Sequence, residues 1–282
     1  MKILVFGRSG QVATELRRFE GVTCVDRSQA DLRDAASCTD IINRTDADVV
    51  INAAAYTAVD HAEKEEAEAN IVNGVTPAAM AQSAAARGLP FVHISTDYVF
   101  DGSGIKPWRE DDPTGPLGAY GRTKLVGENR IQHAGGNYAI LRTSWVFSAH
   151  GKNFVKTMLR LASERKSIAV VNDQIGGPTP ARDIARACMI LARALREKDG
   201  RSGIYHYAGV PDISWASFAR AVFDEAKIDV EVMDIPSSSF PTLAHRPANS
   251  RLDCARIYNA FAIPRPDWRA GLKDVLIDLK VL

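Results

Sequence analysis

Cysteine is scarce in this sequence, and its placement excludes two kinds of site. The four cysteines, Cys24, Cys38, Cys188 and Cys254, are far apart and form no CxxC pair. This spacing offers neither the paired ligands of a zinc site nor the dense disulfide framework of a small secreted domain. We therefore expect free thiols in a reducing compartment.

Long apolar runs and an excess of one charge are also missing. No apolar stretch approaches the roughly 20 residues that cross a bilayer, and the run Lys2–Phe6 is too short for a signal peptide. The 35 basic and 34 acidic residues give a net charge of +1, so no global field attracts nucleic acid or anionic lipid. We expect a cytoplasmic protein with no nucleic-acid or membrane partner, which holds any anion at a local site.

Short apolar segments alternate with longer amphipathic segments along much of the chain. The predicted strands are Lys2–Phe6, Val22–Val25, Val49–Ile51, Phe91–Ile94, Ala139–Leu141 and Ile168–Val171. The predicted helices are Gln11–Phe19, Ala35–Asn43, Glu65–Arg87, Tyr120–His133, Asn153–Ala162, Arg182–Arg196, Trp215–Ala226 and Trp268–Leu279. Several strands are apolar on both faces, which is typical of parallel strands covered by helices.

This alternation predicts an α/β fold with a Rossmann-like, doubly wound parallel sheet. We expect a dinucleotide-binding domain over residues 1–147, to which segments near 165–195 return. A smaller C-terminal substrate-binding lobe is expected over residues 148–282, where proline-rich segments separate the helices. In such a sheet, ligands collect at the carboxyl ends of the strands.

A glycine-containing loop follows the first predicted strand and opens the first helix. Gly7 permits a tight turn, Gly10 lets backbone N–H groups approach a pyrophosphate, and Ala13 is small enough for close packing of helix and strand. An ordinary strand–helix turn is the alternative. The position at the start of an α/β chain favours a dinucleotide-binding loop.

The second strand ends in signals that conflict over the cofactor. Asp26 lies where a carboxylate would bind the ribose of NADH, whereas Arg27 and Arg8 could pair with the 2′-phosphate of NADPH. Either cofactor, or both, therefore stays open.

Tyr120 and Lys124 are four residues apart, so a phenol and an ammonium share one face of the predicted helix. At about 4 Å and an effective dielectric near 20, the pair interacts by about 4 kcal/mol, or roughly three pK units. Such a phenol could exchange a proton with a carbonyl oxygen. A surface pair has the same spacing, but Ser95 and Thr96 follow the strand Phe91–Ile94 and add hydroxyls at its carboxyl end. Turn chemistry is the competing explanation for these hydroxyls.

Together these segments resemble the extended short-chain dehydrogenase/reductases, and among them the nucleotide-sugar reductases. The resemblance covers most of the chain: Gly7–Ala13, Asn52–Asp60, Ser95–Asp101, Tyr120–Glu128, Arg142–Phe147, Asn172–Pro180 and Arg246–Leu252. The strand-end and Arg-Thr-Ser-Trp segments belong to this branch, whereas the loop and the tyrosine–lysine pair belong to the whole superfamily.

The resemblance implies roles for individual residues. The catalytic set would be Thr96, Tyr120 and Lys124. The cofactor would be bound by Gly7, Arg8, Ser9, Gly10, Gln11, Val12, Asp26, Arg27, Asp31, Leu32, Ala53, Ala54 and Tyr56, together with Tyr120 and Lys124. The substrate would be bound by Thr57, Val59, Thr96, Asp97, Tyr98, Trp145, Arg246 and Arg251. Core packing for Trp145 and a plain surface position for Arg246 and Arg251 stay open as alternatives.

The resemblance also implies the reaction. It is hydride transfer from NADPH or NADH to the C4 keto group of dTDP-4-dehydro-β-L-rhamnose, which gives dTDP-L-rhamnose for cell-surface polysaccharide. Some members of the family bind Mg²⁺ between two subunits through glutamates. Glu15 occupies one such position, but Arg182 and Asp183 lie where a second glutamate is expected. We therefore assign no metal site, with Glu15 as the one candidate ligand for Mg²⁺, and a homodimer stays open.

Two other functions share part of this pattern. Nucleotide-sugar dehydratases and epimerases have the same loop and tyrosine–lysine pair, but in dehydratases an Asp-Glu pair follows the strand-end threonine. Here Asp97 and Tyr98 follow it. The second alternative is a non-catalytic dinucleotide-binding subunit that regulates a partner enzyme, because a fold alone does not fix an activity.

Two further residues carry expectations of their own. We expect His93 to be a core histidine, and Asn73 to be either a bridge between backbone groups or a surface residue.

Overall fold

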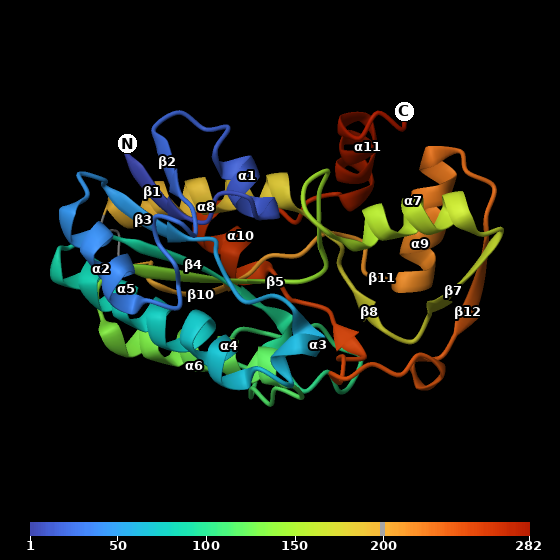
Figure 1. Ribbon diagram of the computed structural model, residues 1–282, viewed down its shortest axis with the longest axis horizontal. Helices are drawn as coiled ribbons and strands as arrows, with labels where there is room; N and C mark the ends of the chain where they lie inside the picture. Colours follow the sequence, from blue (N-terminus) through green and yellow to red (C-terminus); the bar gives the residue numbers. More distant parts are fainter. Residues whose placement is uncertain (198–200) are drawn as a thin grey trace.

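The computed structural model describes residues 1–197 and 201–282. Figure 1 shows a large α/β part that contains the N-terminus and a smaller lobe at one end of it. Helix α11 (Trp268–Asp278) and the C-terminus lie on the side of the smaller lobe. Among the described residues, none of the helices combines the length and the apolar character that a membrane-spanning segment needs.

The centre of the large part is a six-stranded sheet in which every neighbouring pair is parallel. In spatial order its strands are β2 (Val22–Val25), β1 (Ile3–Phe6), β3 (Val49–Asn52), β4 (Phe91–Thr96), β5 (Tyr138–Thr143) and β10 (Gly203–His206). The chain turns back between β1 and β3, which are neighbours in space. This is the switch point at which α/β sheets of this kind bind ligands, and it confirms the predicted fold class.

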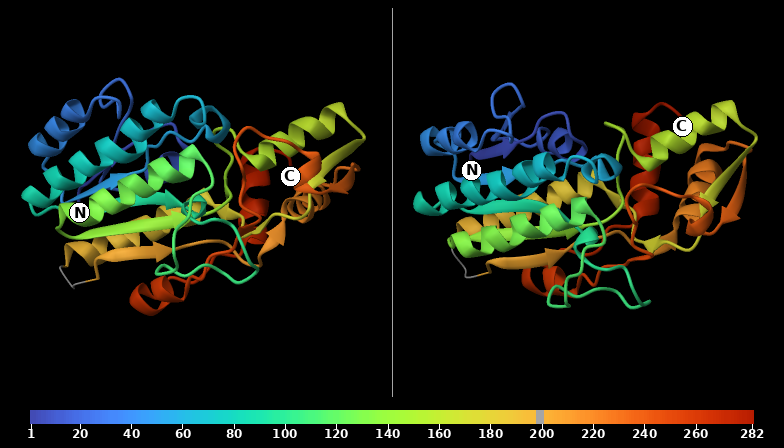
Figure 2. Two further views of the ribbon diagram at one scale, coloured as in Figure 1. Left: turned by 90° about the horizontal axis from the view of Figure 1, so that it is seen from below. Right: turned by 60° about the horizontal axis from the view of Figure 1, so that its bottom comes forward.

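Helices cover both faces of this sheet (Figure 2). In β1, Ile3 and Val5 join a core with residues of α1 (Gln11–Leu16), α8 (Ala181–Arg196) and α10 (Ala255–Phe261). Leu4 and Phe6 of the same strand join a second core with α2 (Ala35–Arg44), α5 (Thr76–Ala86) and α6 (Ala119–Ala134). Alternate side chains of one strand thus enter two cores, which is why the strands are apolar on both faces.

The long helix predicted over Glu65–Arg87 exists as one continuous run with an irregular middle. It consists of α4 (Glu66–Asn70), a π-helical turn η1 (Ile71–Val75) and α5, and a separate short helix, α3 (Val59–Ala62), precedes it. Pro77 has no N–H to donate to the carbonyl of Asn73, which accounts for the irregular turn at this place. A Cβ on Gly127 of α6 would lie 2.1 Å from that carbonyl oxygen, so glycine permits the close approach of α6.

The smaller lobe has its own hydrophobic core. Its elements are α7 (Phe154–Glu164), β7 (Ser167–Val171), α9 (Trp215–Ala226), β12 (Glu231–Ile235) and α11. Phe147, Phe218 and Trp268 are among the buried residues of this core. The predicted strand Ile168–Val171 exists, but it pairs with β12 in this lobe and does not belong to the central sheet. The sixth strand of the central sheet is β10, which the sequence analysis missed.

Short strands join the two parts. β6 (Val146–Phe147) pairs with β9 (Thr179–Pro180), and β8 (Ile175–Gly176) lies between β11 (Ile213–Ser214) and β13 (Asn249–Ser250). Two short 3-10 helices, η2 (Asp97–Val99) and η3 (Ser237–Ser239), complete the described elements. Because α8, β10 and α10 all pack in the large part, the chain crosses between the parts several times. A single domain boundary at residue 147 therefore marks only the first place where the chain passes from the large part to the smaller lobe.

Candidate functional site

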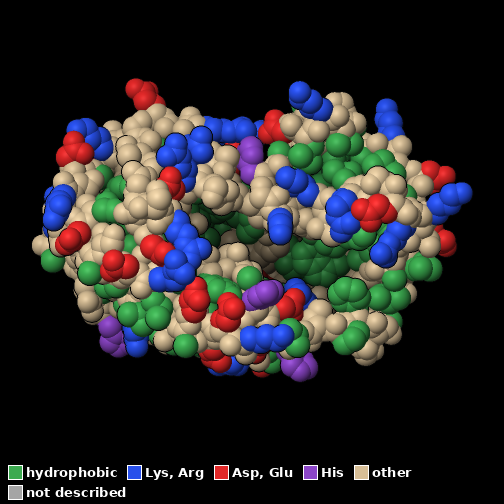
Figure 3. Space-filling view, viewed as in Figure 1, with side chains coloured by type: hydrophobic (Ala, Val, Ile, Leu, Met, Phe, Trp, Pro, Cys, Tyr) green, Lys and Arg blue, Asp and Glu red, His purple; other side chains and the backbone are tan. Residues whose placement is uncertain are grey.

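The carboxyl ends of β1, β3, β4 and β5 bring the predicted site segments to one edge of the sheet. Gly7 follows β1, Ala53 follows β3, and Thr96 and Thr143 are paired at the ends of β4 and β5. Figure 3 shows that the surface is hollowed between the large part and the smaller lobe. The site is therefore built from the strand ends of one part and faces the other.

The glycine loop is shaped by close contact with the end of β3. Gly7 has φ +109°, and a Cβ there would lie 3.4 Å from the carbonyl group of Ala53 and the nitrogen of Ala54. Gly10 precedes α1 in an extended conformation without a side-chain cap, and the first turn of α1 carries no acidic residue. Arg8, Ser9 and Gly10 are exposed. Uncapped amides beside two glycines fit the diphosphate of a dinucleotide.

Carboxylates and arginines alternate beyond the end of β2. Asp26 accepts hydrogen bonds from the backbone N–H (2.9 Å) and hydroxyl (2.6 Å) of Ser28, and these bonds lower the pKa of the Asp26 carboxyl. Arg8 lies 3.5 Å from Asp26, and Arg27 lies 3.3 Å from Asp31. Each arginine predicted to favour a 2′-phosphate is thus already beside a carboxylate. Leu32 is buried in the core between the sheet and α2, away from solvent.

Gln11 connects the glycine loop to the segment that leads into the smaller lobe. Its side-chain oxygen accepts hydrogen bonds of 2.9 Å from both Ser148 and Asn153, and its amide nitrogen lies 3.4 Å from the carbonyl oxygen of Val146. The next residue, Val12, is buried in the core. The side chains of these two residues therefore hold the loop in place.

Two hydroxyls of the predicted catalytic set lie together. The phenol of Tyr120, in the first turn of α6, lies next to the hydroxyl of Thr96. Thr96 also accepts a 3.2 Å hydrogen bond from the backbone N–H of Tyr98, whose ring meets the Tyr120 ring edge-on at 5.5 Å. A Cβ on Gly121 would lie 2.1 Å from the carbonyl oxygen of Tyr98, so this glycine lets α6 approach the strand end.

Lys124 is buried and its amine is directed towards β4. The Nζ atom donates a 2.6 Å hydrogen bond to the carbonyl oxygen of Ile94 and lies 2.9 Å from Nε2 of His93. Burial lowers the pKa of the Lys124 ammonium to about 8. We expected this lysine to lower the pKa of Tyr120, but Lys124 is not among the groups that shift it here. Burial raises the pKa of Tyr120, and the neighbouring Thr96 hydroxyl opposes this rise only in part.

Ser95 does not share the catalytic edge with its neighbour. Its hydroxyl donates a 2.5 Å hydrogen bond to Glu128, which forms a fully buried ion pair with Arg142 at 2.6 Å. Adjacent residues of a strand point to opposite faces, so Ser95 supports α6 from the inside while Thr96 faces the site. The sequence analysis did not identify Glu128 and Arg142 as partners, because only the fold brings them together.

Two buried polar atoms at the edge have no partner among the described residues. One is Oδ2 of Asp97; the other carboxylate oxygen of this residue accepts a hydrogen bond from Thr96. Burial raises the pKa of Asp97 to about 6. The other atom is the hydroxyl oxygen of Thr143, which the sequence analysis missed. Unsatisfied buried groups are rare in native proteins, and a bound ligand would satisfy them.

The segment after β3 is fixed by a buried asparagine. Asn73 accepts a 2.8 Å hydrogen bond from the backbone N–H of Tyr56 and donates to its carbonyl oxygen and to Thr123. Of the alternatives open for Asn73, the structure selects the bridge. Tyr56 packs in one small cluster with Tyr120, and its hydroxyl bonds to Glu65. Thr57 is exposed and Val59 is half-buried at the start of α3.

The predicted substrate arginines differ in their surroundings. Arg246 forms a 2.8 Å ion pair with Asp60 and lies near the phenol of Tyr98, so it lies at the same edge as the strand-end residues. Arg251 donates a 3.0 Å hydrogen bond to Asn249. Both side chains are only partly exposed, which argues against a plain surface position for either.

Trp145 lies in the segment that connects the large part to the smaller lobe. Its φ of +50° is unusual for a bulky side chain. Its ring stacks on Trp215 of α9 with centroids 3.5 Å apart, and a Cβ on Gly176 would lie 2.8 Å from it. The ring thus packs between lobes, and it remains partly exposed.

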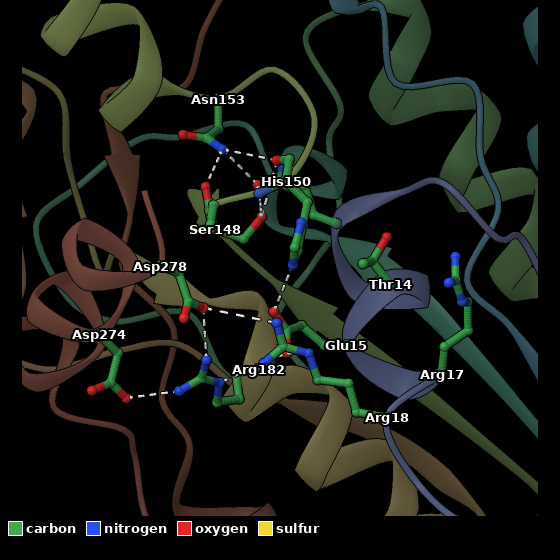
Figure 4. Close-up of polar contacts among 12 residues, drawn as sticks. Thr14, Glu15, Arg17, Arg18, Ser148, His150, Asn153, Arg182, Asp274 and Asp278 are labelled. Atoms are coloured by element: carbon green, nitrogen blue, oxygen red, sulfur yellow. Dashed lines mark hydrogen bonds and ion pairs between the residues drawn. The ribbon is translucent and has the colours of Figure 1, made fainter. Parts of the chain in front are cut away.

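Glu15, the one candidate for a metal ligand, is surrounded by two arginines and a histidine (Figure 4). Its carboxylate lies 3.3 Å from Arg18, 3.3 Å from His150 and 3.7 Å from Arg182. Arg182 pairs in turn with Asp274 and Asp278 of α11. No group of three metal-binding side chains that could hold an ion occurs in residues 1–197 and 201–282. Two guanidinium groups therefore balance the Glu15 charge, and the arrangement does not support a Mg²⁺ site.

The sequence matches the family described as RmlD substrate binding domain over residues 1–281. The dTDP-4-dehydrorhamnose reductase of Burkholderia thailandensis is 45% identical and covers 99% of each chain. That of Escherichia coli strain K12 is 39% identical over 99% of this chain and 98% of the relative. Among solved structures, the dTDP-4-dehydrorhamnose reductase of Clostridium acetobutylicum superposes with a TM-score of 0.93 at 35% identity, over 99% of this chain and all of that one. That of Bacillus anthracis in complex with NADP reaches 0.90 at 30% identity, with the same coverage.

Proposed function

The chain belongs to the dTDP-4-dehydrorhamnose reductase family, and we propose that Tyr120, Thr96 and Lys124 form the site at which it reduces the C4 keto group of dTDP-4-dehydro-β-L-rhamnose. The product is dTDP-L-rhamnose, and the hydride comes from a nicotinamide dinucleotide. One observation carries the assignment of residues. The Tyr120 phenol lies next to the Thr96 hydroxyl at the strand ends, beside the switch point of the sheet.

In this proposal the two hydroxyls act on the same substrate oxygen. A bound NADPH or NADH supplies the hydride that adds to C4 of the sugar. Thr96 donates a hydrogen bond to the carbonyl oxygen, and Tyr120 transfers its phenolic proton to that oxygen as negative charge develops there. The phenolate then regains a proton from solvent. A buried phenol with a raised pKa suits this role, because it keeps its proton until a strongly basic alkoxide forms.

Lys124 would hold the ribose of the cofactor, and the glycine loop would hold the diphosphate. We propose that both NADH and NADPH are accepted. Asp26 offers a carboxylate for a ribose hydroxyl, while Arg8 lies 3.5 Å from Asp26 and can turn to a 2′-phosphate. The relative from Bacillus anthracis, whose structure contains NADP, supports the use of the phosphorylated cofactor.

Asp97, Tyr98 and Arg246 would contact the sugar nucleotide. The unpartnered oxygen of Asp97 offers an acceptor for a sugar hydroxyl, and Arg246 suits the diphosphate because a guanidinium binds phosphate through two hydrogen bonds. Tyr98 occupies the position where dehydratases of this superfamily carry a second carboxylate. Burial raises the pKa of Tyr98 to about 12, so it remains a neutral phenol and a poor base. This favours reduction over dehydration. A cytoplasmic location belongs to the same proposal, since the expected substrate is a biosynthetic nucleotide sugar.

The reaction can be tested with purified protein and dTDP-4-dehydro-6-deoxyglucose, to which the 3,5-epimerase is added to generate the expected substrate. We expect oxidation of one cofactor per molecule of dTDP-L-rhamnose formed, with either cofactor. Oxidation that does not depend on the epimerase would point to a different sugar. Cofactor binding without oxidation would favour the regulatory subunit instead.

A further inference from the structure

Behind α6, a row of three buried polar side chains joins β3, β4 and α6. Asn52, His93 and Lys124 are each at most 1% exposed. Asn52 Nδ2 lies 3.1 Å from His93 Nδ1, and His93 Nε2 lies 2.9 Å from Lys124 Nζ. The catalytic proposal gives the histidine no task, yet it contacts Lys124 directly.

The backbone contact of Asn52 fixes the donor and the acceptor of each hydrogen bond between Asn52, His93 and Lys124. The backbone N–H of Ala54 donates to Oδ1 of Asn52 over 3.1 Å, so the amide nitrogen must be the atom that faces His93. An amide nitrogen can only donate, which makes His93 Nδ1 the acceptor. A neutral imidazole then carries its proton on Nε2 and donates it to Lys124 Nζ. An ammonium has no lone pair to accept this bond.

The charges around Lys124 agree with a neutral amine. Glu128, the carboxylate on the same helix, is already bonded to Arg142 and Ser95. The other titratable groups at this end of α6 are the phenol of Tyr120 and the raised-pKa carboxyl of Asp97, and neither is bonded to the amine. Burial also drives the pKa of His93 well below its usual value. Among the described residues, no carboxylate is hydrogen-bonded to Lys124 Nζ, whose neighbours are His93 Nε2 and the carbonyl oxygen of Ile94.

We propose that His93 is a positioning residue that donates Nε2–H to Lys124 and favours its neutral amine until the cofactor binds. The proposal deepens the proposed function, because it rests on Lys124 contacting the cofactor. Cofactor hydroxyls and a diphosphate offer acceptors and negative charge, which favour the ammonium. Binding of the dinucleotide would then be accompanied by uptake of one proton from solvent. Above the pKa of about 8 that Lys124 has without a ligand, the lysine would become charged when the cofactor binds.

The tautomer of His93 can be measured without any ligand, and it tests whether His93 donates Nε2–H to Lys124. In ¹⁵N-histidine-labelled protein at about pH 8.5, above the pKa of Lys124, long-range ¹H–¹⁵N spectra should place the His93 proton on Nε2. His206 is an internal control, since its Nδ1 lies 3.0 Å from the carbonyl oxygen of Trp108 and its Nε2 3.4 Å from Arg142. These neighbours require the opposite tautomer. A His93 proton on Nδ1 would overturn the proposal.

Asn52→Asp replaces only the amide group by a carboxylate, and it should reverse the direction of the hydrogen bonds from residue 52 through His93 to Lys124. A carboxylate accepts from His93 Nδ1–H, which leaves Nε2 to accept from a charged Lys124. The pKa of Lys124, followed through its ¹³Cε resonance, should rise in Asn52→Asp and stay unchanged in Asn129→Asp, which adds the same charge at an exposed position of α6. An unchanged Lys124 pKa in folded Asn52→Asp would contradict the proposed direction.

Calorimetry of NADPH binding in buffers with different ionisation enthalpies tests whether binding is coupled to the uptake of a proton. At about pH 8.5 the wild-type protein should take up a proton on binding, and Asn52→Asp should take up less. Binding without proton uptake would overturn the coupling. If NADPH does not bind at all, the proposed function fails, while the tautomer measurement still decides the contact between His93 and Lys124.

Discussion

The hydroxyl of Ser95 bonds to the buried carboxylate of Glu128 at 2.5 Å, whereas the hydroxyl of Thr96 lies next to the phenol of Tyr120. Neighbouring serine and threonine residues thus serve different purposes. One stabilises the packing of α6 on the sheet, and the other is available to a substrate. Their different directions make a matched pair of substitutions informative.

Ser95→Ala should reduce stability and leave catalysis nearly intact. Removing the hydroxyl leaves a buried carboxylate with one donor fewer, which costs about 1–3 kcal/mol. Thr96→Ala should instead lower kcat by about 10²-fold, as expected for the loss of one donor to a developing oxyanion, and Thr96→Ser should restore most of the rate. Urea denaturation and steady-state kinetics measure the two effects. A loss of kcat in Ser95→Ala as large as in Thr96→Ala would contradict the assignment.

Asp97 should make the protein less stable as the pH rises from about 4 to 6. Burial raises the pKa of its carboxyl from 3.8 to about 6 in the folded state, so in this range the folded protein binds more protons than the unfolded protein. The cost at neutral pH is on the order of 3 kcal/mol. Asp97→Asn cannot ionise and should be more stable than the wild type at neutral pH, but not at about pH 4. Equal unfolding free energies at neutral pH would show that the carboxyl carries no such cost.

Asp26→Ala should shift the cofactor preference towards NADPH. Loss of a charged hydrogen bond to a ribose hydroxyl costs about 1.5–3 kcal/mol, so KM for NADH should rise about 10- to 100-fold. KM for NADPH should change little, because Arg8 is released from its carboxylate partner. The exposed Asp46→Ala serves as the control. An unchanged ratio of the two KM values would remove Asp26 from the cofactor site.

Chelation should not affect turnover. Glu15 is paired with Arg18 and Arg182, so its charge is balanced without a metal ion. We expect equal initial rates after dialysis against EDTA and after addition of Mg²⁺. A rate that falls on chelation and recovers with Mg²⁺ would mean that these arginines move aside for an ion.

Much of the fold could be predicted because the pattern of apolar residues is strong. Strands that enter two cores, such as β1, are apolar throughout, and the helix Trp215–Ala226 was predicted with its observed bounds. The prediction failed for strand pairing, which depends on tertiary structure. Ser167–Val171 looks like a strand of the central sheet, but it pairs with β12 instead. β10 has only four residues, and nothing in them signals that β5 is its partner.

The site could be predicted as a set of segments but not as a set of contacts. The loop after β1 and the residues Thr96 and Tyr120 meet at the strand ends, as the order of motifs suggested. The sequence gives no means to tell that Gln11 bonds to the segment after β6, or that Lys124 is directed towards His93. Such contacts join residues far apart in the chain, and they depend on side-chain directions that periodicity does not specify.

The central claim is net hydride transfer with Tyr120 as the proton donor, and isotope transfer tests it most directly. With NADPH that carries deuterium at both C4 positions of the nicotinamide, the wild-type protein should place one deuterium at C4 of dTDP-L-rhamnose. Tyr120→Phe should still bind the cofactor but form this product at least about 10²-fold more slowly, while Tyr258→Phe, on the exposed side of α10, should match the wild type. A product without deuterium, or full turnover by Tyr120→Phe, would contradict the account.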